Sequence, residues 1–279
     1  MKHLKLISVI AATAMIFVSC GHKNVGKQAP KMLVLYYSQT SNTKSVAEEI
    51  ANRLGADIEE IHATIPYDGD FQSTIERCMK EREQGILPEI QPVPADIAQY
   101  DVIFIGYPVW FGTYAPPVAA FLDKVDLSGK KIVPFCTFGS GGLESSVSDL
   151  VAKQPSAEVL PGYGVRAARL DAMPGEIDQF LKANGFIEGE YTQLPDFSAQ
   201  RDVSDDEAAI FNAAVGDYPM LHAQPKTVAS RNIPGGVEYL FIAMDLPREG
   251  MSNMPPAGEL QVFVTVADDC QPVFTKVVR

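Results

Sequence analysis

Two short apolar runs stand out in the first half of the chain, MLVLYY at residues 32–37 and DVIFIGY at residues 101–107. Neither run alternates with polar residues, as a strand with one face in solvent would. A strand that is apolar on both sides is typical of a parallel sheet covered by helices on both faces. These runs therefore predict a layered α/β domain.

Segments with helical periodicity alternate with the apolar runs. After the first run, Val46, Ala47, Ile50 and Leu54 recur at the spacing of an amphipathic helix. The alternation predicts strands at 32–37, 57–62, 101–107, 131–137 and 157–160, and helices at 43–54, 71–84, 116–125, 143–151 and 175–184. This order is typical of a doubly wound sheet of five parallel strands, which binds ligands beyond the carboxyl ends of its strands.

The pattern changes after residue 185. Residues 187–204 are mostly polar and read as a linker. They precede a predicted helix at 205–215 and predicted strands at 237–244, 259–266 and 273–278. We therefore expect an α/β domain at 32–186 and a small α+β domain at 205–279.

The N-terminus has the composition of an export signal. Lys2 and Lys5 precede an apolar run, residues 6–18, that is too short to span a bilayer comfortably. The segment Phe17-Val18-Ser19-Cys20 resembles the lipobox of bacterial lipoproteins, which implies a signal peptide at 1–19, lipidation of Cys20 and a polar tether at 20–31. The alternative is an ordinary secretory signal with an unrelated cysteine. Either way, we expect an extracytoplasmic protein, and the lipobox predicts a lipid anchor in a bacterial membrane.

Charge and cysteine content exclude other classes. The signal carries two lysines and no acid, so its removal changes the formal net charge from −12 to −14. This acidity argues against nucleic-acid binding and against electrostatic docking on an anionic membrane. Cys78, Cys136 and Cys270 lie far apart and form no CxxC pair, so we expect each to be a small buried side chain.

Residues 38–43, SQTSNT, lie between the first predicted strand and helix. Their hydroxyls and backbone N–H groups should converge at a helix N-terminus, where the helix dipole favours an anion. No Lys or Arg lies within the loop, which suits a phosphate monoester that is held and not transferred. Taken alone, the hydroxyls could also be ordinary helix caps.

Two more loops follow predicted strands at the same sheet edge. YPVWFGTYAPP, residues 107–117, contains the only Trp of the chain, and an aromatic on such a loop suits a planar heterocycle. Trp110 could instead anchor the loop to the core. TFGSGG, residues 137–142, has glycines that let a backbone approach a ligand, although an ordinary turn would also use them.

Together the three loops give residues 32–186 a resemblance to the flavodoxin-like family, which binds FMN. The first loop fits T/S-x-T-G-x-T except that Ser41 replaces Gly, and residues 107–117 fit P-x-W-x-G-x-x-x-P. The resemblance implies that Trp110 stacks on the isoalloxazine ring and that residues 137–142 follow its pyrimidine edge. The implied cofactor-binding residues are Ser38, Gln39, Thr40, Ser41, Asn42, Thr43, Pro108, Val109, Trp110, Phe111, Gly112, Thr113, Tyr114, Thr137, Phe138, Gly139, Gly141 and Gly142.

The flavin itself carries the redox chemistry, so we assign no catalytic residue and no metal ligand. The expected function is electron transfer to or from a partner or a small acceptor such as a quinone, as an FMN-dependent oxidoreductase or electron carrier. In many flavodoxins a peptide beside the ring flips when one electron is added. Phe111 should resist the positive φ that such a flip needs, whereas Gly112 could adopt it.

The C-terminal segment weakly resembles the cystatin-like fold. Residues 232–239, NIPGGVEY, fall where the first protease-binding hairpin of that fold would lie, but only Gly236 matches Q-x-V-x-G, so we do not expect protease inhibition. A small domain that packs on the flavodoxin-like domain or contacts a partner is the simpler interpretation. An alternative function follows, a cofactor-free flavodoxin scaffold that presents this domain to another protein.

Overall fold

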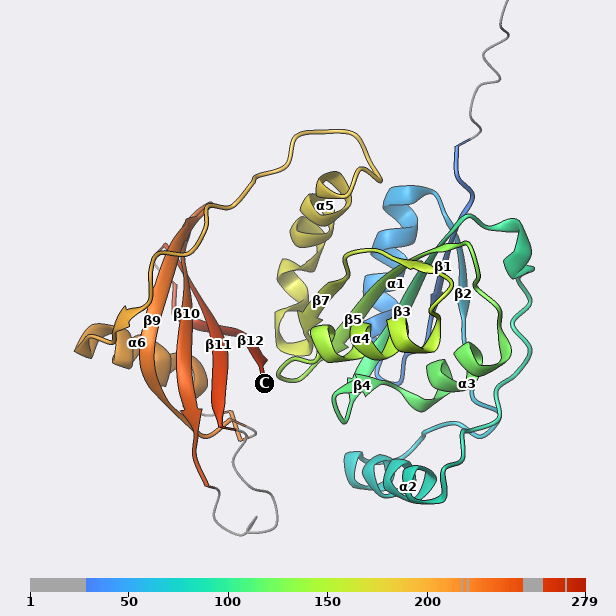
Figure 1. Ribbon diagram of the computed structural model, residues 1–279, viewed down its shortest axis with the longest axis horizontal. Coiled ribbons are helices and arrows are strands. Elements are labelled where there is room, and N and C mark those ends of the chain that lie inside the picture. Colours follow the sequence, from blue (N-terminus) through green and yellow to red (C-terminus); the bar gives the residue numbers. More distant parts are fainter. Residues whose placement is uncertain (1–28, 217, 220, 248–257, 269) are drawn as a thin grey trace, which may run out of the picture.

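A computed structural model describes residues 29–216, 218–219, 221–247, 258–268 and 270–279 (Figure 1). The predicted signal peptide, Cys20 and the tether up to residue 28 lie outside these residues. The described chain forms two domains, each with its own sheet and apolar core. Within the described residues, no helix is long and apolar enough to cross a membrane.

The first domain contains the predicted doubly wound parallel sheet. Its strands are β1 (Met32–Tyr36), β2 (Asp57–Glu60), β3 (Val102–Trp110), β5 (Lys131–Phe138) and β6 (Glu158–Val159), in the order β2-β1-β3-β5-β6. All neighbouring pairs along this path are parallel. The strand order reverses between β1 and β3, which is where such sheets bind ligands.

The fifth strand differs in detail from the prediction. It is split into β6 and β7 (Tyr163–Arg166), and both segments pair with β5 in parallel. Pro161 and Gly162 lie between them, and a proline cannot donate a hydrogen bond to the sheet. A further short strand, β4 (Thr113–Tyr114), pairs antiparallel with the end of β3.

Helices cover both faces of the sheet (Figure 1). They are α1 (Asn42–Leu54), α3 (Pro116–Lys124), α4 (Leu143–Lys153) and α5 (Met173–Ala183). Helix α2 (Phe71–Gln84) lies at one end of the domain, and η1 (Ile97–Gln99) and η2 (Ala167–Ala172) are short 3-10 helices. Leu33 packs in a cluster with residues of α3 and α4, whereas Val34 packs with residues of α1 and α5. Successive residues of β1 thus enter opposite cores, which explains why its sequence is continuously apolar.

The second domain is the predicted small α+β unit. It contains β8 (Arg201–Asp202), α6 (Asp205–Val215), β9 (Ala223–Ile233), β10 (Gly236–Asp245), β11 (Glu259–Ala267) and β12 (Val273–Val278). The strands form an antiparallel sheet in the order β12-β11-β10-β9-β8. Phe211 of α6 packs on Phe241 of β10, with ring centroids 5.1 Å apart.

Two strands of this sheet were not predicted. β8 lies inside the expected linker, and β9, AQPKTVASRNI, is rich in polar residues and contains Pro225. β9 buries only Val228 and Ala229 among its side chains, so its sequence carries little apolar alternation. A strand whose pairing is set mainly by its neighbour β10 leaves little signal in the sequence.

Candidate functional site

The first loop, residues 38–43, leads into α1 and is the predicted anion cradle. Ser41 is the N-cap of α1 with φ of 65°, in the left-handed region, and its side chain makes no capping hydrogen bond. Within the described chain, the backbone N–H groups of residues 38–43 donate to no other protein group. The Ser38 hydroxyl accepts a 3.2 Å hydrogen bond from the Lys44 backbone N–H. Uncommitted donors at a helix N-terminus are a suitable site for a phosphate.

The side chains of this loop point in different directions. Thr40 and Ser41 are exposed, and Ser38 and Asn42 are half-buried. The Gln39 side-chain amide donates to the Tyr67 carbonyl and to Thr74 Oγ1, both at 2.8 Å, so it faces α2. The Thr43 hydroxyl is buried and lies 2.8 Å from the Thr137 hydroxyl. Of the predicted residues in this loop, Ser38, Gln39 and Thr43 therefore have side chains that hydrogen-bond to the protein itself.

The second predicted loop is largely a β-hairpin. Residues 108–110, predicted as loop, continue β3, and Trp110 pairs with Thr113 of β4. Phe111 and Gly112 form the turn with φ of 52° and 81°, and two successive positive φ values are typical of a type I′ turn. The expectation that Phe111 would avoid positive φ is wrong here, because the two-residue hairpin requires it.

Trp110 is braced by aromatic neighbours. Its ring centroid lies 5.9 Å from that of Tyr37 and 5.3 Å from that of Tyr67, both in edge-on geometry. The indole packs against the apolar cluster beneath the sheet, so it anchors the hairpin. Phe111 is 48% exposed, and the Arg82 guanidinium carbon lies 5.2 Å from its ring centroid.

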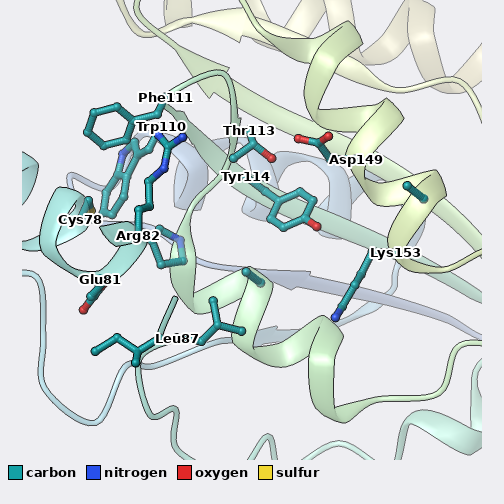
Figure 2. A pocket seen from close by; sticks show the side chains of 14 residues that line it. Cys78, Glu81, Arg82, Leu87, Trp110, Phe111, Thr113, Tyr114, Asp149 and Lys153 are labelled. Atoms are coloured by element: carbon teal, nitrogen blue, oxygen red, sulfur yellow. The ribbon is translucent and has the colours of Figure 1, made fainter. Parts of the chain in front are cut away.

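A cavity of about 480 Å³ lies between the hairpin and helices α2, α3 and α4. Figure 2 shows Trp110, Phe111 and Arg82 at one end of it and Asp149 and Lys153 at the other. Burial raises the pKa of the Cys78 thiol on its wall to about 11, so this thiol is protonated at neutral pH. None of residues 38–43 or 137–142 lines the cavity, which is therefore separate from the anion cradle.

The third loop meets both other loops at the same sheet edge. Thr137 contacts Thr43 of the first loop through their hydroxyls. Gly142 has φ of 112°, and a Cβ built there would lie 2.6 Å from Val109 Cγ1 of β3. The Ser145 hydroxyl, just beyond the loop, donates to the Gly112 carbonyl at 2.5 Å. Phe138, in contrast, is buried as the last residue of β5.

The space around Gly141 is limited by a contact that the sequence does not reveal. A Cβ at Gly141 would lie 2.0 Å from the carbonyl oxygen of Val277 in β12. The Val277 backbone N–H donates to the Ser140 carbonyl at 2.6 Å. The neighbour that requires glycine at position 141 is thus the C-terminal domain, whereas the sequence predicted a ligand beside this loop.

Of the remaining cysteines, Cys136 is buried as predicted, whereas Cys270 is exposed, contrary to expectation. Within the described residues, no group of three or more His, Cys, Asp or Glu side chains is placed to hold a metal ion.

Residues 31–171, just over half of the 279-residue chain, match the sequence model of the family described as Flavodoxin. A solved flavoprotein from Bacteroides eggerthii is 27% identical, with a TM-score of 0.50, and the match covers 57% of this chain and 99% of that one. A flavoprotein from Lactobacillus acidophilus, solved in complex with FMN, is also 27% identical, with a TM-score of 0.47, over 54% of this chain and 98% of that one.

A curated relative, an NAD(P)H dehydrogenase (quinone) from Cupriavidus metallidurans, is 28% identical over 138 residues. This match covers 44% of the present chain and 64% of the relative, so the chain spans less than two thirds of that relative's length.

Proposed function

Because the chain belongs to the flavodoxin family, we propose that it binds FMN at the three loops and passes electrons to or from a partner or a small acceptor such as a quinone. The observation that carries the proposal is the anion cradle of residues 38–43, whose backbone N–H groups are uncommitted within the described chain. The quinone acceptor is suggested by the curated relative, which is named for that activity.

The cradle fits a phosphate monoester. The backbone N–H groups of residues 38–43, with the exposed hydroxyls of Thr40 and Ser41, would surround the phosphate at the N-terminus of α1. No cationic side chain lies inside the loop, so the phosphate would be held by neutral dipoles. The left-handed conformation of Ser41 opens the loop in the way that a glycine would.

The hairpin and the third loop would hold the ring. Trp110 and Phe111 offer aromatic surface at the hairpin, and Tyr37 and Tyr67 fix the indole in place. Within the described residues, the backbone N–H groups of residues 139–142 donate to no other protein group and suit the polar edge of the ring. Bound FMN supplies the redox chemistry, while the chain binds and orients it. The formal net charge, −14 once the signal is removed, disfavours added negative charge, which favours a low potential.

We further propose that the protein is lipid-anchored through Cys20 on the extracytoplasmic side of a bacterial membrane. The support is the sequence of residues 1–20. An exported protein has no direct supply of reduced nicotinamides, so its electrons would come from another donor. Replacing Cys20 with Ser should move the protein from the membrane fraction to the soluble fraction. A wild-type protein that is already soluble after export would contradict the anchor.

The functional test starts from purified residues 21–279 mixed with FMN. The protein should become yellow with one FMN bound, and the reduced complex should be reoxidised by a soluble quinone in an anaerobic stopped-flow experiment. The wild type is compared with the double variant Thr40→Ala, Ser41→Ala, which should need a higher FMN concentration to reach the same occupancy.

A protein that binds no FMN even at high FMN concentration would contradict the proposal. That result would favour a cofactor-free scaffold that presents the C-terminal domain to a partner. The helix and antiparallel sheet of that domain are compatible with the cystatin-like resemblance, on which this alternative depends.

A further inference from the structure

We propose that the C-terminal domain is part of the cofactor site: β12 docks on the third loop and sets its backbone orientation, and this docking and FMN binding strengthen each other. The inference rests on the FMN binding proposed above. In Figure 1 the end of β12 lies beside the α/β domain, close to β7.

The contact between β12 and the third loop is a close backbone contact. The Val277 N–H donates to the Ser140 carbonyl at 2.6 Å, and the Val277 carbonyl occupies the space that a Cβ on Gly141 would need. Gly141 does not have a positive φ, so an alanine there would be strained by Val277 and not by its own backbone. The docked position of β12 therefore requires glycine at position 141.

Arg166, the last residue of β7, joins the third loop to the C-terminal domain. Its Nε donates to the Gly139 carbonyl at 2.7 Å, and its Nη1 donates to the Phe274 carbonyl of β12, also at 2.7 Å. The guanidinium carbon also lies 4.3 Å from the Phe274 ring centroid and 5.0 Å from that of Tyr218. Arg166 thus acts as a positioning residue that links β7, the loop and β12.

These bonds determine where the loop's N–H groups point. The carbonyls of Gly139 and Ser140 are held by Arg166 and Val277. In a planar trans peptide the N–H points opposite to the carbonyl, so the N–H groups of Ser140 and Gly141 point away from those two partners. In the described chain these two N–H groups have no protein acceptor. Docking therefore fixes two donors that the carbonyl edge of the flavin would use.

A salt bridge adds a charge contact at the rim of the same interface. Lys276 Nζ of β12 lies 2.7 Å from Glu144 Oε1 in the first turn of α4. Both side chains are partly exposed, so this pair contributes modestly to docking. It can be reversed without touching the loop backbone, which makes it a useful test.

Coupling between two equilibria is reciprocal. If docking strengthens FMN binding by a given factor, FMN must strengthen docking by the same factor, and such factors are commonly about 5- to 150-fold. We therefore expect FMN to slow hydrogen exchange in residues 273–279, and at the Val277 amide above all, although these residues need not touch the flavin.

The test measures FMN affinity and hydrogen exchange in the same full-chain variants. Gly141→Ala should displace β12, speed exchange in residues 273–279 and weaken FMN binding by at least about fivefold. Gly175→Ala is the matched control, because a Cβ at Gly175 meets no atom within 4 Å. It should behave as the wild type in both measurements.

Gly141 is itself a predicted cofactor-binding residue, so replacing it also changes the predicted FMN site directly. A second variant therefore changes a residue of the C-terminal domain instead. Lys276→Glu places like charges together at Glu144 and should weaken FMN binding by a smaller factor, and adding Glu144→Lys should restore it. A yellow wild-type complex with unchanged exchange in residues 273–279, or an FMN affinity unaffected by Lys276→Glu, would overturn the coupling alone. A wild type that does not bind FMN would overturn the proposed function together with the coupling.

Discussion

The first and third loops follow strands on either side of β3, yet they are supported in different ways. Residues 38–43 depend on local features, a left-handed Ser41 and the start of α1. Residues 139–142 depend on Arg166 and on Val277, which is far away in the sequence and belongs to another domain. One sheet edge therefore combines a loop organised by its own residues with a loop organised by distant ones.

The hairpin between the two loops should give the largest effect on stability. Trp110→Ala removes an indole that packs on Tyr37, the residue just before the first loop. Trp-to-Ala changes in cores lower the free energy of unfolding by about 3–5 kcal/mol, and this ring is partly exposed, so we expect a loss of about 3 kcal/mol. Urea unfolding measures this free energy. Phe111→Ala, at a 48% exposed side chain, is the control and should cost under about 1 kcal/mol. Equal losses would mean that Trp110 is not the anchor.

The hydroxyl pair that joins the two loops should come next. Thr43→Val leaves the buried Thr137 hydroxyl without its partner, which costs about 1–3 kcal/mol. Thr137→Val should cost a similar amount, and the double variant should lose less than the sum of the two. A double-mutant cycle from unfolding free energies measures this coupling. Strict additivity would show that the two hydroxyls do not interact.

Acid should weaken the C-terminal domain, whose strand β12 supports the third loop, because α6 and β12 share one apolar core. A hydrogen bond from Arg201 is the main cause that lowers the pKa of Glu207 in α6 from 4.5 to about 2. The depressed pKa means that this stabilisation is full above pH 4.5 and is lost as the pH falls towards 2. As the pH falls from 4.5 to 3, amide exchange in β12 should therefore become faster relative to amide exchange in β1. Glu207→Gln should show a smaller change over this interval, and an identical pH profile would contradict the assignment.

The smallest expected effect concerns the first loop alone. Ser41→Gly relieves a φ of 65° at a position whose side chain does not cap α1, so it should stabilise the protein by up to about 1 kcal/mol. Ser45→Gly, inside the same helix, should instead destabilise it by about 0.5 kcal/mol. Thermal unfolding of both variants checks the contrast, and a destabilised Ser41→Gly would show that the left-handed turn is not strained.

Local sequence patterns predicted the features that depend on local physics. The continuous apolar runs predicted β1 and β3, because residues such as Leu33 and Val34 enter opposite cores. The hydroxyl-rich segment 38–43 does lead into a helix, and its N–H donors have no acceptor among the described residues. One local feature was missed, the hairpin turn at Phe111, because a phenylalanine gives no signal for a positive φ. Features set by other strands were missed too, namely strand β9, whose pairing is set by β10, and the contact of Gly141 with Val277. A glycine that faces a ligand and one that faces another domain look alike in a sequence.

The central claim is that the first loop holds the phosphate of FMN. The most direct test is a fluorescence titration of residues 21–279 with FMN and, in parallel, with riboflavin, which lacks the phosphate. The account predicts quenched, one-to-one binding of FMN that is at least about tenfold tighter than that of riboflavin, a difference of 1.4 kcal/mol or more. Equal affinities for the two ligands, or no binding of either, would contradict it.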